Sequence, residues 1–233
     1  MNRIVILIVL TIFLGSCSKK SVQLPETDNS NITDIIDVSP AYLFYDETRK
    51  DSVELNRKNL ISTTNWLINV DKRLTLKQVM PSIIFLQNKK RNAEVHKNEA
   101  AKNYFTCSNP KIQNLAFIEF TDVVYHLESS DNYYNNNDKQ LKIKFDQYVS
   151  INVHSNDSTT IEFFSKGYSL ISTSNKDNLL KNITGDFIQN GKILILIELN
   201  QNLTFQDYIT YKSLLLKLNI KNVTISNDEF IYN

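Results

Sequence analysis

The chain is poor in the residues that build several kinds of functional site. Its 233 residues include two cysteines, three histidines and four glycines. Three of these glycines follow residue 16, at Gly167, Gly185 and Gly191, and none belongs to a glycine-rich phosphate-binding loop. The motifs Gly-x-Ser-x-Gly, His-Glu-x-x-His and Cys-x-x-Cys are also absent. From the sequence we therefore assign no catalytic residue, no cofactor and no metal ligand.

An excess of charge of either sign is missing as well. Lys and Arg number 26 and Asp and Glu number 25, and Arg3 is the only charged residue among residues 1–16. Residues 17–233 are therefore formally neutral. Because binding to nucleic acid needs a concentrated basic surface, we predict that nucleic acid is not a partner. A hydrophobic content of 42% favours a globular core over wholesale disorder.

The amino-terminal residues do carry a recognisable pattern. Arg3 precedes an apolar run over residues 4–13, which Leu14-Gly15-Ser16-Cys17 follows. A basic start, an apolar stretch and small residues before a cleavage site are typical of a secretory signal. The Leu-Gly-Ser-Cys ending resembles a bacterial lipobox. The resemblance implies cleavage between Ser16 and Cys17 and acyl chains, such as palmitate, on Cys17.

A membrane-spanning helix and a free secreted protein are the alternatives to a lipid anchor. A helix over residues 4–16 would be about 20 Å long, whereas the hydrocarbon core of a bilayer is about 30 Å thick. Lys19 and Lys20 follow, and a lysine at the bilayer centre costs about 3 kcal/mol, so a spanning helix is disfavoured. A free secreted protein would have the apolar run but would not require Cys17 at this position.

The whole chain resembles uncharacterised lipoproteins of the Bacteroidetes type. In that group, surface display is associated with acidic residues just after the cysteine, whereas this chain has Ser18-Lys19-Lys20. The resemblance implies a cell-envelope protein at the outer membrane, facing the periplasm. Its partners would be membrane lipid, through acylated Cys17, and an unidentified envelope protein or glycan.

The sequence divides into a signal peptide (1–16), a lipidated tether (17–38) and a globular domain (39–233). The tether is polar and is expected to be extended; alternatively, Ile32, Ile35 and Ile36 dock on the domain as a short helix. An Asn-rich stretch near residues 129–139 is a candidate boundary between two subdomains.

The pattern along residues 39–233 predicts an α+β fold with a mixed, largely antiparallel sheet. A capping box at Thr75 and Gln78 predicts a helix that runs toward Lys90. A second helix is expected over residues 94–104. A carboxy-terminal strand-helix-strand unit closes the chain. We predict strands at 41–45, 52–55, 59–70, 115–120, 123–127, 141–153, 159–164, 168–172, 193–197, 222–226 and 230–232, and later helices at 177–183 and 205–218.

Two segments of the chain are similar in sequence. Residues 68–78 match residues 197–207 without a gap, and both have a strand, a polar turn and a Leu-Thr helix start. This is either a duplication or what any such junction requires. Residues 196–225 also resemble the periplasmic domain of the ExbD/TolR biopolymer-transport family. Because Asn200 replaces the family's turn Asp and residues 4–13 contain no acid, the resemblance implies only a local fold.

Two histidines and a cysteine are candidate chemical groups. Cys107 lies among aromatic residues and is predicted to be a buried hydrophobe rather than a nucleophile. His126 is near Asp122 and Glu128, which permits a metal site, but ordinary polarity at a strand end is the favoured interpretation. His154 continues the polar side of its strand and is expected to be exposed.

Two further features lie on expected surfaces. His96 and Glu99 have helical spacing and are predicted to be a solvated pair. Tyr133 and Tyr134, in the Asn-rich stretch, are aromatic residues that could bind a sugar or a partner, or belong to a disordered loop.

These observations favour a lipid-anchored, non-enzymatic binding or scaffold domain of unknown ligand. The alternatives are an envelope enzyme, such as a hydrolase whose groups converge only on folding, and an accessory subunit of an ExbD/TolR-like complex.

Overall fold

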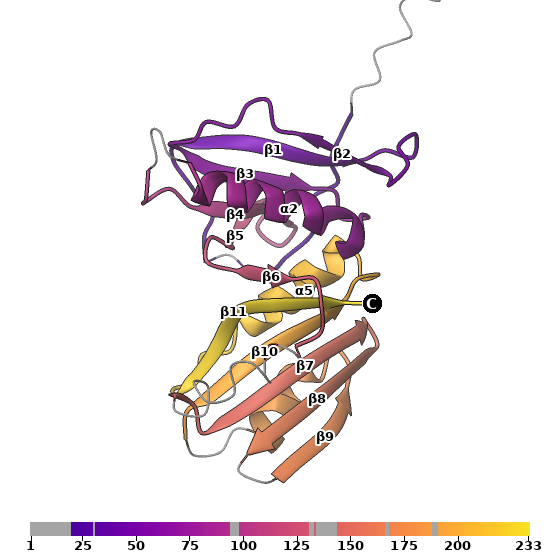
Figure 1. Ribbon diagram of the computed structural model, residues 1–233, viewed down its shortest axis with the longest axis vertical. Helices are drawn as coiled ribbons and strands as arrows, with labels where there is room; N and C mark the ends of the chain where they lie inside the picture. Colours follow the sequence, from indigo (N-terminus) through magenta and orange to yellow (C-terminus); the bar gives the residue numbers. More distant parts are fainter. Residues whose placement is uncertain are drawn as a thin grey trace, which may run out of the picture.

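The computed structural model describes residues 20–29, 31–93, 98–130, 133, 144–165, 168–187 and 191–233 (Figure 1). Ser16, Cys17, His96 and Tyr134 lie outside this part of the chain. The described residues form two mixed β-sheets with helices packed on them, which confirms the α+β class. The two sheets lie toward opposite ends of the long axis of the molecule.

The first sheet has the strand order β2-β1-β3-β4-β5, and helix α2 connects β3 to β4. Strands β1, β3, β4 and β5 and helix α2 all contribute buried apolar side chains at this end of the molecule. The elements are β1 (Val38–Tyr45), β2 (Val53–Asn56), β3 (Asn65–Val70), α2 (Leu76–Arg91), β4 (Asn103–Asn109) and β5 (Asn114–Glu119).

The second sheet has the strand order β6-β11-β10-β7-β8-β9, and helix α5 connects β10 to β11. The central strand β10 is buried at seven of its eight positions, as its unbroken apolar run predicts. The elements are β6 (Val124–His126), β7 (Gln147–Ser155), β8 (Ser158–Ser165), β9 (Tyr168–Ser174), α4 (Leu179–Asn182), the π-turn η1 (Ile183–Phe187), β10 (Ile193–Asn200), α5 (Phe205–Leu215) and β11 (Val223–Tyr232).

Three expectations need correction. The first is the expectation of a largely antiparallel sheet. Both sheets have parallel strands at their centres, β1-β3-β4 and β7-β10-β11, and only the outer hairpins are antiparallel. Asn103 and Tyr104, expected at the end of a helix, begin strand β4, because tertiary pairing with β3 overrides their weak helical pattern. The strand expected over residues 59–70 begins at Asn65, after a turn in which the Trp66 indole donates to the Ile61 carbonyl at 2.7 Å.

The two halves share a core of four strands and one helix with the same strand order and directions. In each, an antiparallel hairpin (β1-β2 or β7-β8) contributes its first strand to a parallel pair with β3 or β10. A helix then returns the chain to a third parallel strand, β4 or β11. The similarity between residues 68–78 and 197–207 is therefore one part of an internal structural repeat. In the strand, turn and helix around α2, each residue corresponds to the residue 129 positions later, around α5.

The two halves contact each other through the similar turns within residues 68–78 and 197–207. The Leu76 N–H donates to the Leu203 carbonyl at 2.9 Å, and the Phe205 N–H donates to the Leu74 carbonyl at 2.7 Å. These two bonds exchange equivalent residues and flank a bridge between Thr75 and Thr204. The two turns are thus related by an approximate local two-fold axis at the helix N-caps Thr75 and Thr204.

The chain passes from the first sheet to the second between Glu119 and Val124. The predicted subdomain boundary near residues 129–139 falls largely outside the described part of the chain. Upstream of β1, the predicted tether is not free from Lys20 onward. Pro25 accepts a hydrogen bond from the Ser108 N–H at 2.8 Å, and the Thr27 N–H donates to the Ser108 carbonyl at 2.9 Å.

Candidate functional site

A polar cluster occupies the core of the second half where the first half is apolar. On α2, Val79 and Ile83 are fully buried and face the core. The equivalent residues on α5 are Tyr208 and Lys212. The difference extends to the third parallel strand: Phe105 pairs with Ile68 in the first half, and Glu229 pairs with the equivalent Ile197 in the second.

The side chains of the cluster are in direct contact. The Lys212 ammonium forms an ion pair with Glu229 Oε1, and the Tyr208 hydroxyl donates to Glu229 Oε2 at 2.9 Å. Tyr125, on β6, lies 3.0 Å from Tyr208, oxygen to oxygen. Because Tyr208 gives its single hydroxyl proton to Glu229, Tyr125 is the donor in this second bond. We call Tyr125, Tyr208, Lys212 and Glu229 the polar cluster.

Burial dominates the electrostatics of this cluster. Glu229 is 1% exposed and Tyr208 is fully buried. Burial, followed by the negative charge of Glu229, raises the pKa of both Tyr125 and Tyr208 well above the usual value. Both phenols therefore stay neutral and act as hydrogen-bond donors. Lys212 is the cation that compensates Glu229, and its side chain remains 12% exposed.

Two members of the polar cluster, Lys212 and Glu229, line a cleft of about 320 Å³ at the junction of the halves. One wall is the connection between β5 and β6, with Glu119 and Asp122, and another is the carboxy-terminal part of α5, with Leu215. A bulge in β11 forms a third wall, because β10 residues 195–197 face β11 residues 225–229. Bulges often lie next to functional sites, where they redirect side chains. Here the bulge brings Ser226 and Asn227 to the cleft.

An ion pair in a protein core costs free energy of desolvation. Desolvation of both charges can exceed their attraction, and replacement by well-packed apolar residues is often neutral or stabilising by about 1–4 kcal/mol. The first half uses that apolar solution at the equivalent positions, with Ile83 and Phe105. The second half keeps charge beside a cleft, which is the arrangement expected of a binding site.

A second constellation lies on the opposite face of the second sheet. His126 Nε2 is 2.8 Å from Asp228 Oδ1, and the Tyr133 hydroxyl donates to Asp228 Oδ2 at 2.8 Å. The His126 ring stacks on Phe230 with 4.8 Å between centroids. Burial, with Asp228 as a further cause, raises the pKa of Tyr133 to about 12. Tyr133 is therefore a packed residue rather than an exposed aromatic platform.

The other residues singled out from the sequence do not converge. Burial raises the pKa of the Cys107 thiol to about 12, and its side chain is fully buried, which confirms the apolar interpretation. His154 is exposed, as expected, and lies 2.6 Å from the Tyr232 hydroxyl. His126 pairs with Asp228 instead of Asp122 or Glu128. Within the described residues, no group of His, Cys, Asp and Glu could hold a metal ion.

Sequence reasoning missed the polar cluster. Its members come from three elements, and Tyr125 on β6 is 83 positions before Tyr208, so they form no sequence motif. The available signal was the similarity between residues 68–78 and 197–207. Continued into the two helices, this alignment pairs Val79 with Tyr208 and Ile83 with Lys212, so that apolar residues on the core-facing side of α2 correspond to polar residues on α5.

No protein-family model, curated protein or solved structure matches this chain. Among the helices of the described residues, none combines the length and apolar character that crossing a bilayer requires.

Proposed function

We propose that this protein is a cell-envelope lipoprotein, anchored through acylated Cys17 at the periplasmic face of the outer membrane, and that it is a non-enzymatic binding domain. Its binding site is the cleft between the halves. The lipobox-like Leu14-Gly15-Ser16-Cys17 supports the anchor. The enzyme and accessory-subunit alternatives stay predictions.

The observation that carries the binding proposal is the Lys212–Glu229 pair at the cleft. A volume of about 320 Å³ suits a small molecule rather than a folded partner. Leu215 and Leu216 offer apolar surface beside the ion pair, while Ser226 and Asn227 add polar groups. The ligand that fits is small, with an apolar part and a polar group that hydrogen-bonds to the pair, such as a fragment of an envelope peptide or glycan.

The test is to purify the protein in mild detergent from its native envelope and to measure its mass under native conditions. The unmodified protein should retain a small molecule, and the double variant Lys212→Ile/Glu229→Leu should lose it by at least tenfold in occupancy. Lys217→Ile is the matched control, because Lys217 follows the same helix but pairs with Asp28 away from the cleft. Equal retention by the double variant, or no retained molecule in any form, would contradict the proposal.

A further inference from the structure

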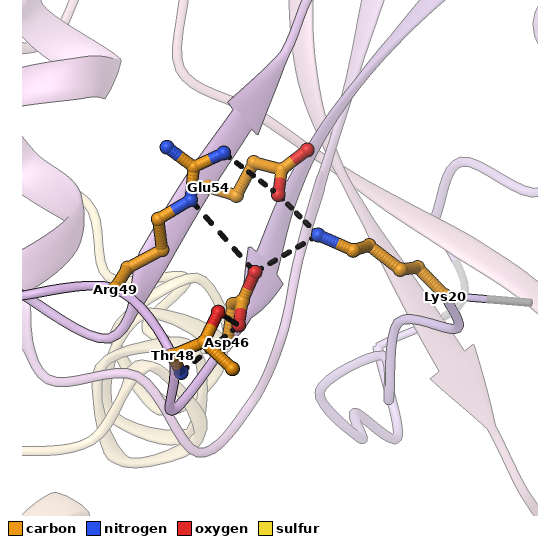
Figure 2. A network of polar contacts seen from close by, with 5 residues as sticks. All are labelled: Lys20, Asp46, Thr48, Arg49 and Glu54. Atoms are coloured by element: carbon orange, nitrogen blue, oxygen red, sulfur yellow. Dashed lines mark hydrogen bonds and ion pairs between the residues drawn. The ribbon is translucent and has the colours of Figure 1, made fainter. Parts of the chain in front are cut away.

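The segment before β1 is fixed to the body from its first described residue. The Lys20 ammonium contacts Asp46 Oδ2 at 2.8 Å and also pairs with Glu54, at the ends of β1 and β2 (Figure 2). Arg49 Nη2 lies 3.4 Å from Glu54 Oε2, and the Thr48 hydroxyl donates to Asp46 Oδ1 at 2.5 Å. Lys20 is thus held in a network that spans the turn between β1 and β2.

Backbone bonds hold the residues that follow. The Gln23 N–H donates to Asp71 Oδ2 at 3.1 Å, and the Gln23 carbonyl accepts from the Lys72 N–H at 2.8 Å. Exposed ion pairs alone are weak anchors, usually below about 1 kcal/mol each. The bonds at Gln23, together with those of Pro25 and Thr27 to Ser108, make the segment part of the folded body. The position of Lys20 is therefore set by the fold.

This docking shortens the distance available to a lipid anchor. Cys17 and Lys20 are separated by three peptide steps, which span about 11 Å at most. A free tether of the 21 residues from 18 to 38 would instead reach about 70 Å. Each headgroup layer of a bilayer is about 5–8 Å thick. If Cys17 is acylated at the membrane surface, Lys20 lies within one or two headgroup layers of it.

From this geometry we infer a membrane-contact surface: the turn between β1 and β2 lies against the lipid headgroups, and the second sheet points away from the membrane. This inference rests on the proposed acylation of Cys17. Glu47, Arg49, Lys50 and Asp51 on this turn are exposed and balanced in charge. The short connection, rather than attraction to anionic lipid, therefore holds the surface in place.

The orientation has a consequence for the cleft. The first sheet lies near one end of the long axis and the β8-β9 hairpin near the other (Figure 1). With the β1-β2 turn at the membrane, the second sheet extends into the periplasm. The cleft, at the junction of the halves, then lies between the membrane and the far end of the body.

The test uses the full-length lipidated protein in vesicles of phosphatidylethanolamine and phosphatidylglycerol that contain a lipid with a headgroup nitroxide. A fluorophore is attached to Lys50→Cys or to Ser169→Cys, both exposed positions. Cys107 is fully buried and does not compete for the label in the folded protein. We expect the label at position 50 to be quenched at least threefold more strongly than the label at position 169.

A 20-residue Gly-Ser spacer inserted between Ser18 and Lys19 is the matched control, because it adds about 25 Å of flexible reach without changing the body. It should remove most of the difference between the two labels. Equal quenching at both positions, or no effect of the spacer, would overturn the inference while acylation stands. If the unmodified protein carries no more acyl chain than the Cys17→Ala variant, the proposed anchor itself is wrong.

Discussion

The two halves of this molecule show which residues their shared topology requires and which it leaves free. Both keep the strand, the polar turn and the Leu-Thr helix start, and these turns also form the seam between the halves. They differ inside, because Ile83 and Phe105 fill the first core whereas Lys212 and Glu229 occupy the equivalent places in the second. The topology therefore does not need the charges, and the charges face a cleft.

The largest effect is expected from removal of one charge. Lys212→Met leaves Glu229 buried without its cation and should lower the free energy of unfolding by about 3–5 kcal/mol. The matched control is Ile83→Met at the equivalent position of the first half, which should cost less than about 1.5 kcal/mol. Urea denaturation of both variants measures the comparison. Similar losses would mean that the two helices are energetically alike at this position.

The buried lysine of the first half provides a pH test. Lys90 donates to the carbonyls of Thr64 and Lys102 at 3.2 and 2.8 Å, and burial lowers its pKa to about 8. The unfolded chain keeps the ordinary value near 10.5, so between pH 8 and 10.5 it binds more protons than the folded chain. Stability relative to Lys90→Met should therefore rise with pH across that range, by about 3 kcal/mol at most.

The measurement is urea denaturation of both proteins at several values between pH 7.5 and 10.5. Taking the difference cancels the other titrating groups, including the tyrosines. A difference that does not change with pH would show that the Lys90 ammonium is solvated in the folded state.

The smallest effect concerns the helix caps at the seam. The Thr75 N–H donates to the Gln78 side chain at 2.8 Å, and the Thr204 N–H donates to the Asp207 side chain at 2.9 Å. Gln78→Ala and Asp207→Ala should each cost about 1 kcal/mol. Only the second loss should shrink with added salt, because Asp207 also interacts with the helix dipole. Thermal unfolding at low and high salt distinguishes the two, and equal salt dependence would contradict this interpretation of the caps.

Local patterns were enough to predict much of the fold. The capping residues Thr75 and Thr204 marked both helices, and the apolar run of β10 marked the buried central strand. Strand β4 was missed although Tyr104, Phe105 and Thr106 favour strands, because Asn103, Ser108 and Asn109 at its ends do not, and pairing with β3 and β5 fixes its length. Such pairing is a long-range property that a local window does not contain.

The candidate site could not be predicted in the same way. Tyr125, Lys212 and Glu229 have no common motif, and each taken alone looks like an ordinary surface residue. These residues can be recognised as a candidate site only from their burial, which follows from the packing of α5 on its sheet, and from the comparison with the equivalent residues of the first half. The docked segment from Lys20 was also hidden, because its backbone bonds at Gln23 and Ser108 leave no trace in hydropathy.

The most direct test of the central claim is the free energy of unfolding of Lys212→Ile/Glu229→Leu, measured beside the unmodified protein after both are freed of ligand. If the pair is kept for binding, this double variant should match the unmodified protein within about 1 kcal/mol or exceed it by up to about 4 kcal/mol. It should also fail to retain the small molecule. A loss of stability as large as that of Lys212→Met would contradict the claim and would show that the ion pair is needed by the fold itself.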